Sequence, residues 1–267
     1  MNSYLEKIKR IRTQLTVAGA AGAVLSTQDN VFYATGFSSV MDGWHLAEPI
    51  AAVFVPAKAA SPVVLILPEA SVISPIVSER GGHPIHYDRL ATFDMLNFCE
   101  TARAADAHLA LPEDLLAELG EVMGRIEGDC KPDIIQTIAA SLSRHVAKND
   151  LILFDDLRVA ARVEALNGQS TGDALEAMFA ARAVKTEDEL NTLRESGRIA
   201  DDIMAYTISQ LGIGKSWSEV EKQVAHFMID HDVDPLPGSP MLFGGAYDLV
   251  FRPDLFRTPV SRPFKGG

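Results

Sequence analysis

The stretch of residues 182–230 constrains the fold most, because it predicts two consecutive helices. Thr186 is followed three residues later by Glu189, and Ser216 is followed by Glu219. Both pairs have the spacing of a capping box, in which a hydroxyl and a carboxylate satisfy free backbone N–H groups where a helix begins. Apolar residues then recur at helical spacing in both segments. The first stripe comprises Leu190, Leu193, Gly197, Ala200, Met204, Ile208 and Leu211, and the second Val220, Val224, Phe227 and Met228.

Each of these two helices carries a continuous apolar stripe, which requires a surface to pack against. Burial contributes about 25 cal/mol per Å² of apolar area, so stripes left in water would cost several kcal/mol against a typical stability of about 5–15 kcal/mol. After residue 230 the sequence offers one expected short strand, Met241 to Phe243, and a tail broken by prolines. One strand cannot cover two helices. We therefore expect residues 182–267 to be the first part of a larger domain, and the chain to be a fragment of a longer polypeptide.

Residues 1–181 alternate between expected strands and helices, a pattern that indicates an α/β domain with a mixed sheet covered by helices. We place the domain boundary between residues 181 and 182, after the linker-like run Gly168 to Asp173. The expected helices are 4–18, 93–105, 113–124 and 133–147, and the expected strands are 20–26, 31–34, 49–55, 63–67, 84–87, 109–111 and 151–154.

Composition excludes several classes of partner. The formal net charge of −12 argues against nucleic acid or an anionic membrane as the main partner. No apolar run approaches the roughly 20 residues needed to cross a membrane. Cys99 and Cys130 show no metal-binding or redox spacing, so we interpret them as two buried or partly buried free thiols of a cytoplasmic protein.

Two motifs resemble one family. The run Arg182-Ala183-Val184-Lys185-Thr186-Glu187-Asp188-Glu189-Leu190 is similar to the domain junction of the creatinase/prolidase/aminopeptidase-P family, the M24 "pita-bread" metallohydrolases. The run Asp29-Asn30-Val31-Phe32-Tyr33-Ala34-Thr35-Gly36-Phe37 resembles a strand and turn of the same family. The resemblance implies a creatinase-like N-terminal domain with a mixed sheet over residues 1–181. An incomplete pita-bread (α+β) domain over residues 182–267 would follow it.

The same resemblance implies a metal-dependent hydrolase of the Xaa-Pro peptidase or creatinase type, acting on a C–N bond of a small peptide or amidino substrate. A complete peptidase of this family is expected to hold two divalent ions (Mn, Co or Zn) and to form a homodimer. The ions activate a bridging water and polarise the scissile carbonyl. No part of residues 1–267 matches the family's ligand motifs, so no metal ligand, cofactor or catalytic residue is assigned, and we expect this fragment to be inactive.

Four residues are candidates for substrate binding. Trp44 and His45 lie in the segment after the turn, where family members carry a loop that reaches a neighbouring subunit's active site. The alternative is a Trp packed on its own domain. Phe251 and Arg252 occupy the place where peptidase members carry a substrate-contacting His. Arg252 suits a substrate carboxylate, although an ordinary surface role remains the alternative.

Other polar pairs have simpler interpretations. His83 and His86 are expected on a strand, where an offset of three places them on opposite faces and disfavours a shared metal. Asp155 and Asp156 are adjacent and diverge, so we interpret them as structural. Two alternatives to the hydrolase stay open: a metal-free pita-bread module that binds peptide or protein, and a lyase branch of the same family. The sequence after Gly267 would distinguish them.

Overall fold

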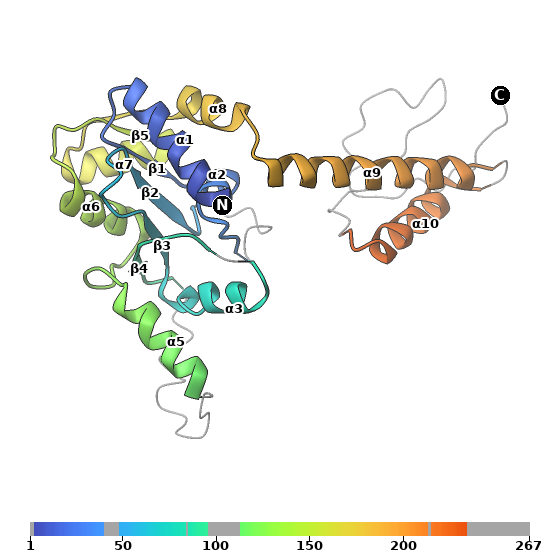
Figure 1. Ribbon diagram of the computed structural model, residues 1–267, viewed down its shortest axis with the longest axis horizontal. Helices are drawn as coiled ribbons and strands as arrows, with labels where there is room; N and C mark the ends of the chain where they lie inside the picture. Colours follow the sequence, from blue (N-terminus) through green and yellow to red (C-terminus); the bar gives the residue numbers. More distant parts are fainter. Residues whose placement is uncertain (1–2, 40–47, 84, 96–112, 213–214, 234–267) are drawn as a thin grey trace. The chain divides into compact units, whose positions relative to one another are not determined.

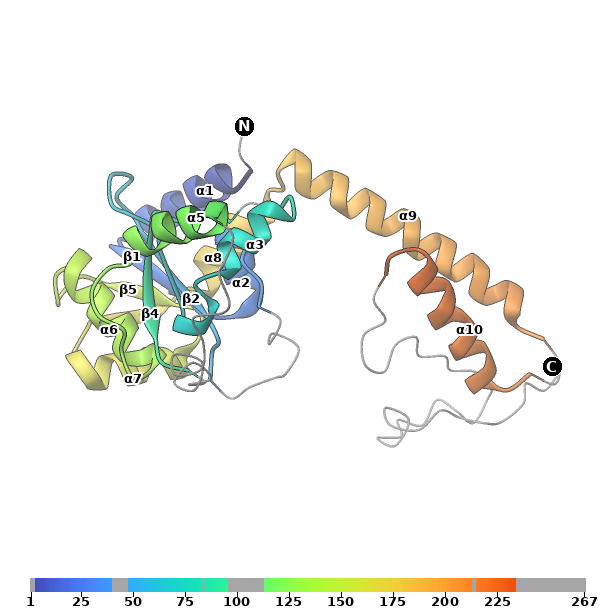
Figure 2. The same ribbon diagram turned by 90° about the horizontal axis from the view of Figure 1, so that it is seen from below.

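The structure is a computed structural model, shown from two directions in Figures 1 and 2. The chain divides into two compact units, residues 1–186 and 187–267. Among the described residues, no helix has the length and apolar character needed to span a bilayer. The residues that the structure describes are 3–39, 48–83, 85–95, 113–212 and 215–233.

The first unit is built on a six-stranded mixed sheet with the strand order β4-β3-β2-β1-β5-β6. β2 pairs antiparallel with both β1 and β3, whereas β1–β5, β3–β4 and β5–β6 are parallel pairs. The predicted mixed sheet of an α/β domain is therefore confirmed. The strands are β1 (Gly22–Leu25), β2 (Ala52–Pro56), β3 (Val64–Pro68), β4 (Arg89–Phe93), β5 (Ile152–Phe154) and β6 (Thr171–Asp173).

Helices cover both faces of the sheet, and the strands alternate their side chains between two apolar clusters (Figure 2). In β2, for example, Val53 and Val55 belong to one cluster, and Ala52 and Phe54 belong to the other. The first cluster includes residues of α1 (Ser3–Val17), α2 (Gln28–Thr35), α3 (Ser74–Arg80), α5 (Glu113–Gly124) and α8 (Leu175–Ala183), and the second includes residues of α6 (Ile134–His145) and α7 (Leu157–Asn167).

The outer edge of β4 is occupied by the chain that follows α5. Leu90 pairs with Ile126, and Phe93 pairs with Lys131, both as parallel bridges. The backbone N–H of Lys131 donates to Thr92 O at 3.0 Å. The opposite edge strand, β6, has only three residues.

Residues 31–34 form part of helix α2, so the predicted strand there is wrong. Val31, Phe32 and Tyr33 favour a strand locally, but the carboxylate of Asp155 fixes the preceding turn. It accepts hydrogen bonds from the backbone and hydroxyl groups of Ser26 and Thr27, at 2.6–3.2 Å, and from the side chain of Asn30 at 2.9 Å. Tertiary hydrogen bonding thus overrides local propensity. The helix ends at Gly36, whose φ of 78° is the left-handed conformation that suits glycine.

The strand expected over residues 84–87 is also wrong where the structure describes it, over residues 85–87, because strand pairing starts later, at Arg89. β4 then continues to Phe93, where a helix was expected to begin. The edge segment described above satisfies the backbone groups of this strand, and the local sequence gives no sign of it. The remainder of the expected helix, 96–105, and the expected strand 109–111 lie outside the described residues.

Three further expectations need correction. The linker-like run Gly168 to Asp173 contains the edge strand β6, which pairs with β5 through Ile152 and Thr171. Helix α7, which begins at the N-cap Asp156, was not predicted. Cys130 is a free thiol, but it is exposed rather than buried, and Cys99 lies outside the described residues.

The second unit contains the predicted helix pair, α9 (Glu187–Gln210) and α10 (Trp217–Asp230). The capping box of Ser216 and Glu219 is present, which confirms that prediction. Three residues of α10 are buried against partly buried residues of α9 and the following turn: Val220, Val224 and Met228 contact Ile203, Tyr206 and Val233. The predicted stripe of α9, by contrast, lies largely in solvent, because these contacts use another face of the helix. Its exposed members include Leu193, Met204, Ile208 and Leu211.

Candidate functional site

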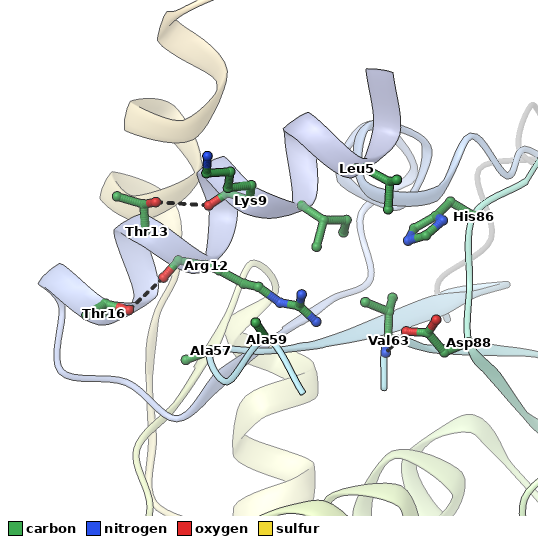
Figure 3. Close-up of a pocket in the computed structure, with 11 residues that line it drawn as sticks. Leu5, Lys9, Arg12, Thr13, Thr16, Ala57, Ala59, Val63, His86 and Asp88 are labelled. Carbon is green, nitrogen blue, oxygen red and sulfur yellow. Dashed lines mark hydrogen bonds between the residues drawn. The ribbon is translucent and has the colours of Figure 1, made fainter. Parts of the chain in front are cut away.

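A pocket of about 420 Å³ lies in the first unit between α1, the turn that joins β2 to β3, and the segment that precedes β4 (Figure 3). Its volume falls within the range of small-molecule sites in proteins. It combines apolar side chains with groups of both charges, and so it is the candidate ligand site of the described residues. The lining residues are Leu5, Ile8, Lys9, Arg12, Thr13, Thr16, Ala57, Ala59, Val63, His86 and Asp88.

Helix α1 supplies one wall of this pocket because of its periodicity. The apolar positions Ile8, Ile11 and Leu15 are buried against the sheet. Lys9 and Arg12, one and four residues beyond Ile8, therefore lie beside this stripe and reach the pocket rather than the core. Leu5, which lies one turn before Ile8, is 49% exposed and also lines the pocket.

Arg12 is held in place by two backbone carbonyl groups at the ends of the β2–β3 turn. Its Nε donates to Pro56 O at 3.1 Å, and its Nη2 donates to Ser61 O at 3.1 Å. These bonds fix the guanidinium plane between the helix and the turn. Arg12 thus gives the pocket a positively charged group of defined orientation.

Asp88 and His86 form the opposite side (Figure 3). The Oδ2 atom of Asp88 accepts a hydrogen bond from the backbone N–H of Val63 at 2.8 Å, and the backbone N–H of Asp88 donates to Val63 O at 2.9 Å. The backbone N–H of His86 donates to Thr35 O at 2.7 Å, which ties this segment to the end of α2. Backbone contacts therefore position both side chains.

The charges of the pocket influence one another. Partial burial lowers the pKa of the Arg12 guanidinium, while the charge of Asp88 opposes that change. Burial also lowers the pKa of His86; Asp88 acts in the opposite direction, and Arg12 adds to the lowering. Asp88, Arg12 and His86 are thus close enough to interact, and the imidazole favours its neutral form near pH 7.

A second polar cluster surrounds Glu127 on the other face of the sheet. Its Oε1 accepts a hydrogen bond from Ser141 Oγ at 2.8 Å, and its Oε2 lies 2.8 Å from His145 Nε2. Ser141 is 0% exposed and binds the carboxylate rather than the imidazole. A serine nucleophile requires contact with its base and access to substrate. We therefore assign this cluster a structural role.

The four residues predicted to bind substrate, Trp44, His45, Phe251 and Arg252, lie outside the described residues. Within the described ranges no three His, Cys, Asp or Glu side chains converge as a metal site would require. The described part of the chain therefore supplies no ligand set that fits a two-metal centre.

The sequence did not single out the pocket residues Arg12 and Asp88. Polar residues beside the apolar stripe of a surface helix are common, so Arg12 looks ordinary in the sequence. Asp88 is separated from it by 76 positions and meets it only through the β2–β3–β4 arrangement. His86 was considered only as part of a pair with His83, and the functional signal lies in its tertiary neighbours instead.

The fold of the chain is that of the prolidases and Xaa-Pro dipeptidases, which confirms the resemblance to creatinase/prolidase proteins at the level of the fold. No protein-family model and no curated protein sequence matches the chain.

Three solved structures illustrate the likeness. The prolidase from Thermococcus sibiricus is 14% identical over 100% of this chain and 60% of its own, with a TM-score of 0.58. A dipeptidase from Pyrococcus horikoshii is 15% identical over 98% of this chain and 58% of its own, with a TM-score of 0.59. The dipeptidase PepE from Mycobacterium ulcerans is 17% identical over 90% of this chain and 52% of its own, with a TM-score of 0.53. The chain thus spans between half and two thirds of each of these structures.

Proposed function

We propose that this chain belongs to a metal-dependent hydrolase of the Xaa-Pro peptidase or creatinase type, which cleaves a C–N bond of a small peptide or amidino substrate. The observation that carries the proposal is the fold likeness to a prolidase over 100% of the chain, at a TM-score of 0.58. The junction motif at residues 182–190 supports it from the sequence. We further propose that the boundary between the two family domains falls between residues 181 and 182, near the end of α8 and shortly before the division between the compact units after residue 186.

Two divalent metal ions would supply the chemistry of such an enzyme: they would activate water and polarise the substrate carbonyl. The sequence of residues 1–267 contains no match to the family's ligand motifs, so we assign none of its residues to these ions. We propose that the active enzyme is a homodimer and that Trp44 and His45 contact substrate at the partner's cleft. Phe251 and Arg252 are proposed to face the substrate, with Arg252 pairing with a carboxylate.

The test uses the native polypeptide, expressed from its own chromosomal gene. An affinity tag is inserted at the chromosomal locus before Met1, and the captured polypeptide is characterised by its intact mass and its metal content. It is then assayed with Xaa-Pro dipeptides, creatine and a sulfonium compound. Chelator-sensitive hydrolysis of a C–N bond is the expected result. Saturable peptide binding without turnover would favour the metal-free binding module, and cleavage of the sulfonium compound would favour the lyase.

Two further measurements sharpen this test. Recombinant residues 1–267 alone, given excess Mn²⁺, Co²⁺ or Zn²⁺, should show no hydrolysis, because they lack the ligand motifs. In the active polypeptide, Trp44→Ala should raise KM or lower kcat without changing the unfolding midpoint. Unchanged kinetics on the true substrate would remove Trp44 from the site.

A further inference from the structure

The pocket beside α1 carries opposite charges on opposite walls, with apolar side chains between them (Figure 3). Arg12 extends from the helix towards Val63 and Asp88, whereas the ammonium group of Lys9 points away from the Arg12 guanidinium. Leu5 contributes exposed apolar surface to the same pocket, and Ile8 and Val63, which are 2% and 1% exposed, also line it. This arrangement distinguishes it from the hollow next to α3 and α5, where Arg80 is already paired with Asp114 and Glu118.

Arg12 has hydrogen-bonding capacity left for a ligand. Its two bonds to the β2–β3 turn use Nε and Nη2, and among the described residues Nη1 has no hydrogen-bond partner. A guanidinium has five N–H donors, so three remain. Lys9 is exposed one helical turn away; its ammonium group points away from Arg12 in Figure 3, and it adds positive charge to the same wall. The α1 wall is therefore suited to a carboxylate.

The opposite wall is suited to a cation. Asp88 uses Oδ2 to bind the backbone N–H of Val63, and within the described part of the chain Oδ1 accepts no hydrogen bond. The Asp88 side chain is exposed, so a ligand can reach it.

Thr13 and Thr16 belong to the α1 wall. Their hydroxyl groups donate to the carbonyl groups of Lys9 and Arg12, at 2.9 Å each, so they present a methyl group and lone pairs to the pocket rather than donors.

We propose that this pocket binds a small zwitterion of the α-amino carboxylate class, with an apolar side chain. The carboxylate pairs with Arg12 Nη1, and the exposed Lys9 adds positive charge to the same wall. The ammonium group pairs with Asp88 Oδ1, and the side chain packs on Leu5. A simple anion would leave Asp88 unpaired, and a simple cation would leave the two basic residues unpaired. The site lies within the first unit, and the proposal does not depend on hydrolase activity.

The experiment is an NMR titration of residues 1–267 with three compounds that share an apolar side chain. L-valine carries both charges, 3-methylbutanoate carries only the negative charge, and valinamide carries only the positive charge. Backbone amide signals of Lys9, Val63 and Asp88 report on the pocket. We expect saturable shifts with L-valine, weaker binding of each single-charge analogue, and no shift at Val224 in the second unit. Glycyl-L-valine carries the same two charges further apart, so its affinity relative to L-valine tells whether a free amino acid or a short peptide is preferred.

Two variants test which charged group of the ligand each side chain binds, and both leave the hydrogen bonds between Arg12 and the β2–β3 turn intact. Lys9→Gln should weaken L-valine and 3-methylbutanoate by about two- to fivefold, as expected for an exposed ion pair, and leave valinamide unchanged. Asp88→Asn retains an acceptor for the Val63 N–H and should weaken L-valine and valinamide while leaving 3-methylbutanoate unchanged. Lys222→Gln, on the second unit, is the matched control and should change none of the affinities.

Two results of these titrations would contradict the proposed zwitterion site. It is overturned if L-valine at ~50 mM, well above the millimolar affinity that about 4 kcal/mol of binding free energy represents, causes no saturable shift at the pocket amides. It is also overturned if Lys9→Gln and Asp88→Asn affect the three compounds alike. Circular dichroism and the unfolding midpoint of each variant verify that the pocket is folded in every titration.

Discussion

The Oδ2 atom of Asp155 accepts a hydrogen bond from Asn30 Nδ2 at 2.9 Å, although the two residues are 125 positions apart in the chain. The Oδ1 atom of Asn30 in turn accepts a bond from Arg182 Nη1 at 3.0 Å. Asp155 follows β5, Asn30 belongs to α2, and Arg182 belongs to α8. One relay of side chains therefore links three elements of the first unit that backbone pairing does not join.

Removing this carboxylate should destabilise the first unit. Asp155→Ala leaves the donors of Ser26, Thr27 and Asn30 without their acceptor, and we expect a loss of about 2–3 kcal/mol in the free energy of unfolding, measured in urea. Asp156→Ala is the neighbouring control: it removes the N-cap of α7, which contributes about 1 kcal/mol. Equal losses in the two variants would show that the relay contributes nothing beyond an ordinary cap.

Gly36 is expected to tolerate no side chain. Its φ is +78°, and an added Cβ would lie 2.6 Å from Tyr4 Cζ. Gly36→Ala should cost about 2–4 kcal/mol, from left-handed strain and overpacking together. Gly82 has a similar φ of +82° with nothing within 4 Å of an added Cβ, so Gly82→Ala should cost only about 1–2 kcal/mol. A smaller loss at Gly36 than at Gly82 would contradict the packing of Tyr4 against this turn.

His86 should make the stability of the first unit depend on pH. Burial is the main cause that lowers its pKa below the ordinary value of about 6.5. The unfolded chain therefore binds a proton more readily than the native state, so stability is complete above about pH 6.5 and falls as the pH drops through the native pKa. His86→Gln should flatten the dependence of the unfolding free energy between about pH 5 and pH 8. The exposed His83→Gln should leave the dependence as in the parent; if it flattens the curve equally, His86 is not its source.

The apolar stripe of α9 should contribute little to the stability of the chain by itself. Ile208 is 61% exposed, whereas Val224 of α10 is 0% exposed. Ile208→Lys should change the unfolding free energy of the second unit by less than about 0.5 kcal/mol, and Val224→Ala should cost about 1–3 kcal/mol. The exposed stripe should also bind a hydrophobic dye, and this binding should fall in the Ile208→Lys variant. A large loss from Ile208→Lys would mean that a partner surface covers the stripe.

Much of the fold follows from local patterns. The β-branched and apolar runs over residues 49–55 and 63–67 predict the central strands β2 and β3, and the Ser216–Glu219 pair predicts where α10 begins. The failures occur where distant residues decide the local structure. Residues 31–34 have strand propensity, yet Asp155 fixes the turn that starts a helix. The hydrogen-bonding partners of β4 along its outer edge, residues 125–131, are 36 positions or more along the chain from Arg89.

Sequence patterns do not predict the candidate pocket, for the same reason. Arg12 and Asp88 line the same pocket because α1 packs across the β2–β3 turn, and no spacing within the sequence encodes that arrangement. The residues that the sequence did single out, such as Trp44 and Arg252, were chosen through the family resemblance, and they stay predictions.

The segment of residues 125–131 along β4 also bears on how the protein behaves at high concentration. An open sheet edge offers a row of unpaired N–H and C=O groups on which another chain can add as a further strand. Here Leu90 and Thr92 already exchange backbone hydrogen bonds with this segment, at 2.7–3.0 Å. The other edge, β6, is three residues long and reads Thr-Gly-Asp, too short and too polar to act as a template. Strand addition between copies is thus disfavoured at both edges of the sheet, although its central strands β1, β2 and β3 are apolar and fully buried.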